Sequence, residues 1–91
     1  MKQDRLYETA KRCSFTVILF TDHPSFFSSW SITVKKNENS YMLEHEGRDS
    51  WLIFYREMAP NKLEEIDKKS SHAMTDDEKV DQCEIWLSAI A

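Results

Sequence analysis

The stretch YMLEHEGRDSW, residues 41–51, holds the side chains of this chain whose types and spacing could do chemistry. It sets Glu44, His45, Glu46 and Asp49 between two aromatic residues. Carboxylates with a histidine can bind a metal ion or exchange protons. If residues 41–46 form a strand, successive side chains point to opposite faces. Glu44 and Glu46 then share one face and His45 takes the other, so we expect no metal site here.

Glu44 and Glu46 are also a poor pair for general acid/base catalysis. Such a pair needs one pKa raised by burial or by a neighbouring like charge. A two-residue step along a strand separates these carboxylates by about 7 Å, which weakens their mutual effect. We interpret them as a solvated strand face. The EGRD segment is then a hairpin turn at Gly47, the residue best able to adopt a positive φ, with Arg48 and Asp49 as a surface pair.

The remaining candidate residues do not predict an active site. Cys13, Asp22 and His23 could pair a nucleophile with a base only if the fold assembled them, and Cys13 falls on a core stripe instead. His72 lies in a polar loop. One glycine in the whole chain argues against glycine-rich phosphate cradles and dinucleotide-binding turns. The sequence therefore predicts a protein that is not an enzyme and that carries no cofactor.

The hydrophobic pattern predicts an α+β fold with a four-stranded antiparallel sheet. Strands are expected at residues 30–35, 41–46, 50–57 and 62–67, the last of them a charged edge strand. Residues 3–21 have apolar side chains at three- and four-residue steps, which favours a helix to about Thr21. Their β-branched end, FTVILF, leaves open a shorter helix followed by a strand.

The C-terminal part of the chain predicts a second helix. TDDE at 75–78 fits a capping box, in which Thr75 caps the first turn and Glu78 reaches back to it. Both terminal helices are expected to pack on the sheet within a single domain spanning residues 1–91. The third strand is apolar on both faces, so we expect helices over one face and other chain segments shielding the second.

Two surfaces are candidates for binding a partner. Trp51 or Leu52 with Phe54 could surface as an apolar patch beside an acidic rim of Glu44, Glu46 and Asp49, next to Arg48. FFSSW at residues 26–30 raises the same possibility, although core packing is the favoured interpretation for each tryptophan. The second surface is the acidic C-terminal helix, with Asp76 and Asp77 in its first turn.

Charge and composition restrict the class of partner. The net charge is −4, and residues 57–91 hold nine acidic and four basic groups. This balance disfavours nucleic acid and anionic membrane and favours a basic protein surface, unless it serves solubility alone. The longest apolar run, residues 17–20, is too short to cross a bilayer, and a signal-peptide pattern is absent. We expect a cytoplasmic protein in which Cys13 and Cys83 are buried free thiols.

Residues 26–67 support a more specific interpretation. FFSSW, SYMLEHEGRDSWLIF and KLEEID, followed by a capped helix ending in WLSAI, resemble small immunity proteins that bacteria encode beside polymorphic toxins. The similarity is greatest to the TriTu-like group, which neutralises an ADP-ribosylating Rhs toxin that attacks elongation factor Tu. The matching positions are mostly apolar framework, and the N-terminal helix departs from the group's pattern. The resemblance implies a cytoplasmic, non-catalytic protein that binds one cognate toxin in a one-to-one complex.

The leading hypothesis is therefore an immunity protein that occludes a toxin's active site or target-docking surface. A phage or host inhibitor of a nuclease or defence complex is the alternative within binding proteins. A small enzyme that uses His45 or the carboxylates is the alternative from another class.

Overall fold

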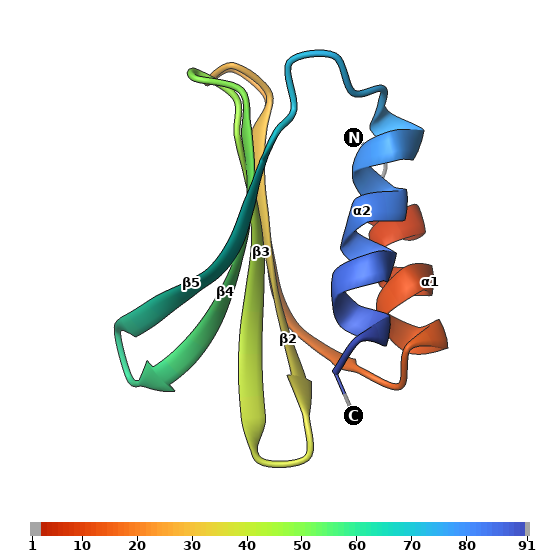
Figure 1. Ribbon diagram of the computed structural model, residues 1–91, viewed down its shortest axis with the longest axis vertical. Coiled ribbons are helices and arrows are strands. Elements are labelled where there is room, and N and C mark those ends of the chain that lie inside the picture. The colour runs from red at the N-terminus through yellow and green to blue at the C-terminus, as the bar shows by residue number, and fades with distance from the viewer. Residues whose placement is uncertain (1–2, 91) are drawn as a thin grey trace.

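The computed structural model describes residues 3–90 as two helices and five strands in the order αβββββα. The elements are α1 (Gln3–Arg12), β1 (Thr16–His23), β2 (Ser29–Lys36), β3 (Asn39–Glu46), β4 (Trp51–Ala59), β5 (Lys62–Ser70) and α2 (Asp76–Ser88). The strands form one antiparallel sheet in chain order, and both helices lie on the same side of it (Figure 1). The α+β prediction is confirmed, but the sheet has five strands where four were predicted. Residues 1, 2 and 91 of the predicted domain lie outside the described residues.

The additional strand is β1, so the prediction of a helix to Thr21 is wrong and the alternative left open is right. Helix α1 ends at Arg12, and Ser14 takes a left-handed conformation with φ 67° before the chain extends. The pairing of β1 with β2 shifts between Val17 and Leu19, where one extra residue forms a bulge. Val17 and Phe20 consequently both pack against the core although they are three residues apart. A bulged strand has thus reproduced a helical spacing.

The hydrophobic core fills the space between the sheet and the two helices. Its centre is an aromatic stack in which Phe54 lies between Tyr41 and Trp86, with ring centroids 5.7 and 5.5 Å apart. The Trp86 Nε1–H donates a hydrogen bond of 2.9 Å to the carboxylate of Asp67 on β5, which satisfies the indole where it reaches the sheet. Helix α2 is therefore fixed to the sheet by both packing and a directional bond.

The two helices run parallel, side by side (Figure 1). Arg5 pairs with Asp77 near their N-terminal ends and Arg12 pairs with Glu84 further along.

The predicted capping box opens α2: Thr75 Oγ accepts from the Glu78 amide at 3.1 Å, and Glu78 Oε1 accepts from the Thr75 amide at 3.0 Å. No helix within residues 3–90 is long and apolar enough to span a bilayer.

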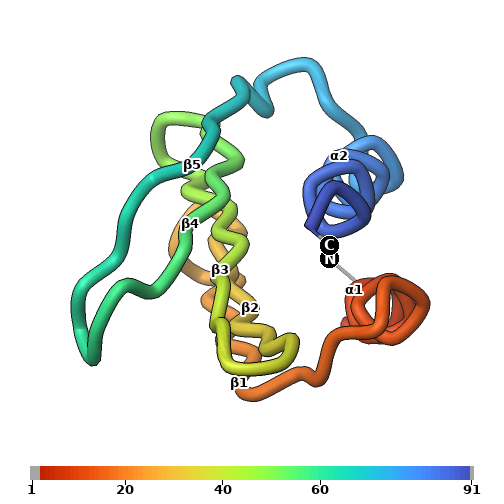
Figure 2. Tube along the Cα trace, turned by 60° about the horizontal axis from the view of Figure 1, so that its bottom comes forward, coloured from red at the N-terminus to blue at the C-terminus, as the bar shows by residue number. Residues whose placement is uncertain are grey.

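The sheet is not flat. Two irregularities interrupt the pairing of β4 with β5, one between Phe54 and Tyr55 and one between Glu57 and Ala59. Bulges of this kind bend and twist a hairpin. Figure 2 shows the β4–β5 hairpin turning away from the helices, toward the other side of the sheet. That side, which neither helix covers, is called the open face below.

Candidate protein-binding face

Strand alternation fixes which side chains lie on the open face. Ile32, Val34, Tyr41, Leu43, Leu52 and Phe54 belong to the core, so their sequence neighbours point the other way. The pairing register then aligns these neighbours across the strands, as in Thr33 with Met42 and Tyr55, or Ser31 with Glu44 and Ile53. The central residues of the open face are Ser31, Thr33, Met42, Glu44, Glu46, Trp51, Ile53 and Tyr55.

A small apolar cluster lies in the middle of this face. Ile53 is only 7% exposed, although it is outside the core cluster between the sheet and the helices. The Lys68 ammonium of β5, whose residue pairs with Ile53, lies 4.1 Å from the centre of the Trp51 ring. A cation over an indole face is an attractive contact, and the lysine stem covers apolar surface at the same time. The open face therefore carries packed apolar side chains without a helix above them.

Tyr55 links this cluster to the acidic part of the face. Its hydroxyl donates a hydrogen bond of 3.0 Å to Glu44 Oε1. Burial, together with the charge and hydrogen bond of Glu44, raises the pKa of Tyr55 to about 12. The phenol therefore stays protonated at neutral pH, and it holds the Glu44 carboxylate in a fixed position.

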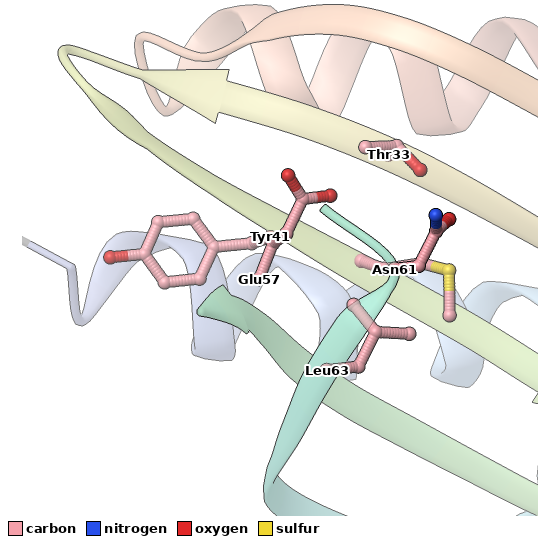
Figure 3. Close-up of a pocket in the computed structure, with 6 residues that line it drawn as sticks. Thr33, Tyr41, Glu57, Asn61 and Leu63 are labelled. Carbon is pink, nitrogen blue, oxygen red and sulfur yellow. The ribbon is translucent and has the colours of Figure 1, made fainter. Parts of the chain in front are cut away.

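Two hollows indent the open face. One of about 320 Å³ lies where the β4–β5 hairpin curls toward β2 and β3. In Figure 3, Asn61 and Leu63 of the hairpin lie opposite Thr33, while the Tyr41 ring points away. The second, of about 240 Å³, lies beside the β1–β2 connection and includes Ser31 and Glu44 in its lining. Ser31 and Thr33 are consecutive open-face residues of β2. Thr33 lines the first hollow and Ser31 lines the second, so the two hollows lie in line along the strand.

The predicted partner-binding residues divide between the faces of the molecule. Glu44, Glu46 and Trp51 lie on the open face, as the acidic and aromatic surface that was expected. Arg48 and Asp49 are exposed in the turn between β3 and β4. The Glu46 carboxylate accepts hydrogen bonds from their backbone amides at 3.1 and 2.9 Å, so Glu46 also caps this turn.

Phe54 does not lie on this surface. It is 2% exposed and stacks on Trp86 beneath the helices, and Leu52 is fully buried on the same side. The segment is apolar on both faces, so composition did not identify which residues meet the helices. Trp51, Ile53 and Tyr55 form the patch instead. On this second face, the curled β4–β5 hairpin supplies shielding of the kind that was expected.

The second candidate surface belongs to a different layer of the molecule. Asp76 and Asp77 lie in the first turn of α2, where Asp77 pairs with Arg5 and Asp76 is 3.5 Å from the Lys79 ammonium. Because α2 covers the opposite side of the sheet, these carboxylates and those of Glu44 and Glu46 cannot share one flat contact.

His45 confirms the prediction from alternation. It is 6% exposed on the helix side, next to Trp30 at 5.9 Å between ring centroids. Its Nδ1 lies 3.0 Å from the Ser28 carbonyl oxygen, and because a carbonyl only accepts, this nitrogen carries the hydrogen. Burial lowers the pKa of His45 below its ordinary value. Within residues 3–90, no group of three or more potential ligands could hold a metal ion.

The candidate nucleophile set is not assembled. Cys13 follows α1, whereas Asp22 and His23 are the last two residues of β1, so most of that strand lies between them and Cys13. His72 is exposed after β5. Cys13 and Cys83 are both free thiols, Cys83 fully buried as predicted and Cys13 only partly so.

Gly47 has a different role from the one predicted. Its φ is not positive; Ser50 takes the left-handed conformation in this turn instead, with φ 59°. A side chain at Gly47 would overlap the carbonyl group of Phe27 from the β1–β2 connection. The glycine therefore permits a close approach between two turns that are far apart in sequence, a requirement that no local pattern reveals.

Comparisons with protein-family models, curated proteins and solved structures gave no match.

Proposed function

We propose that this chain is a non-catalytic immunity protein that binds a protein toxin through its open face. One observation carries the proposal: both helices pack on the same side of the sheet, which leaves the other side uncovered with apolar side chains at its centre. An antiparallel sheet with one solvated face normally places polar residues there. Met42, Trp51 and Tyr55 are instead only partly buried on this face, and a partner would complete their burial.

The arrangement of charge supports a protein partner. The apolar centre is flanked by Glu44 and Glu46, and the hollow beneath the hairpin includes Glu57. An apolar core with a polar rim is the common anatomy of protein interfaces. Carboxylates at the rim accelerate association with a basic surface.

The class of toxin follows from the resemblance of residues 26–67 to immunity proteins. For an ADP-ribosylating Rhs toxin, covering either the nicotinamide cofactor pocket or the target-docking surface suffices for neutralisation. A one-to-one complex is expected, because one chain offers one open face.

Co-expression with the toxin domain encoded by the neighbouring gene tests this proposal. We expect a one-to-one complex and protection of the producing cells. Met42→Arg, which places a charge at the apolar centre, should weaken binding at least a hundredfold. Ile85→Arg is the matched control, because Ile85 is 61% exposed on α2. Failure of the unaltered proteins to associate, or loss of binding only in the Ile85 variant, would overturn the proposal.

A further inference from the structure

Two phenylalanines are exposed at the connection between β1 and β2. Phe26 and Phe27 are 54% and 60% exposed, and their rings meet edge to face with centroids 5.2 Å apart. The remaining phenylalanines, Phe15, Phe20 and Phe54, all contribute to the core. These two rings therefore contribute little to the stability of the fold for their size, because only apolar area that is removed from water is stabilising.

The backbone that presents the rings is strained. Phe27 and the following Ser28 both have φ 55°, in the left-handed region that non-glycine residues rarely occupy. Such a conformation persists only where surrounding contacts enforce it, and it is concentrated at functional positions.

The end of β3 enforces this conformation. His45 donates from Nδ1 to the Ser28 carbonyl at 3.0 Å, and the Gly47 amide donates to Ser29 Oγ at 3.0 Å. The Phe27 carbonyl packs against the bare Cα of Gly47. Within the turn, the Phe26 amide bonds to the His23 carbonyl and the Ser29 amide to the Phe26 carbonyl, both at 3.0 Å. The two rings are thus held in place before any partner arrives, which lowers the entropy lost on binding.

An acidic hollow adjoins the exposed rings. The cavity of about 240 Å³ on the open face is lined by Phe26, His23, Glu44 and Glu46 among others, and neither lysine nor arginine appears in its described lining. Two carboxylates beside an aromatic ring suit a lysine or arginine side chain, through charge and through contact with the ring. They also oppose the approach of an anionic lipid surface.

We propose that the Phe26–Phe27 turn is the preformed anchor with which this chain docks on a basic protein surface. The two rings enter an apolar pocket of the partner, while a partner lysine or arginine occupies the hollow beside Phe26, Glu44 and Glu46. The inference rests on the proposed function and specifies which part of the open-face side contributes most of the binding energy. Interfaces commonly concentrate their energy in a few such aromatic anchors.

The test measures binding of the neighbouring gene's toxin domain by titration calorimetry. We expect Phe26→Ser combined with Phe27→Ser to weaken binding at least a hundredfold, whereas Ile85→Ser, an equally exposed position, leaves it unchanged. Glu44→Gln should weaken binding about tenfold and reduce its salt dependence, because the amide still accepts from Tyr55 but has lost the charge. If the double variant fails to fold, Phe26→Ser alone makes the same test, since Phe26 lies outside the left-handed pair.

The outcomes separate the two proposals. If the unaltered chain binds and the phenylalanine variants bind equally well, the anchor is refuted and the proposed function stands. If the unaltered chain does not bind, both fall. Vesicles containing anionic phospholipid are the second probe, and association that depends on Phe26 and Phe27 would replace the protein partner with a membrane.

Discussion

Gly47→Ala gives a sharp test of how the two turns are held together. A β-carbon at this position would overlap the Phe27 carbonyl oxygen and lie 2.8 Å from the carbonyl carbon. Backbone on both sides must then move apart, and insertion of one carbon into close packing costs about 1–3 kcal/mol. Separation also breaks the hydrogen bond from the Gly47 amide to Ser29 Oγ, which contributes about 1 kcal/mol. Alanine offsets about 0.4–1 kcal/mol of these costs by restricting the unfolded chain, so we expect a net destabilisation of about 2 kcal/mol.

The sign of the change in stability shows whether the position of the Gly47 side chain is blocked by the Phe27 carbonyl or lies in open space. The φ of Gly47 is not positive. In open space, alanine would therefore stabilise the fold by about 0.4–1 kcal/mol, because it reduces the conformational entropy of the unfolded chain. Urea denaturation monitored by tryptophan fluorescence measures the change, and backbone amide shifts of Ser28 and Ser29 report the displaced turn. Asp49→Ala, exposed in the same turn, is the control and should change stability by less than about 0.5 kcal/mol. A Gly47→Ala protein as stable as the original would refute the close approach.

Three further predictions follow from groups whose pKa is shifted in the folded protein. Burial lowers the pKa of His45 in the folded protein below 6.5, so at pH values between the two the unfolded chain binds more protons than the folded one. Stability should therefore fall as the pH falls, and the urea concentration at the unfolding midpoint should decrease from pH 7.5 to pH 5.5. The variant His45→Asn should show a smaller decrease. Burial raises the pKa of both thiols, that of Cys83 to about 12, but Cys83 is fully buried and Cys13 only partly so. A thiol reagent should therefore modify Cys13 in the native protein and Cys83 only after unfolding, as mass spectrometry can show. The Trp86 indole lowers the pKa of Asp67 by donating to it, so Trp86→Phe should raise that pKa in an NMR titration, and an unchanged value would contradict the assigned contact.

Local patterns predicted the features that depend on near neighbours in the chain. Period-two alternation placed Glu44 and Glu46 on one face and His45 on the other, as the structure has them. The TDDE motif located the start of α2, because a capping box closes within four residues. The charged KLEEID segment is an edge strand as predicted. The role of the acidic and aromatic surface residues stays a prediction.

The errors arose where a local pattern has two structural solutions. Val17 and Phe20 fit a helix by spacing, and the same spacing fits a strand that contains a bulge. Leu52 and Phe54 could not be distinguished from Trp51 and Ile53 as surface residues, since all four are apolar. Only the position of the helices assigns one pair to the core and the other to the open face.

The sequence by itself therefore determined the α+β class, the face that each residue of β3 occupies and the start of the last helix, because each depends on interactions within a few residues. Tertiary structure decided that both helices cover the same side of the sheet, and that Gly47 and His45 clamp the turn at Phe27 and Ser28. Those features arise from contacts between segments that lie 17 or more residues apart in the sequence. Their geometry is set by packing in three dimensions, which spacing along the chain does not encode.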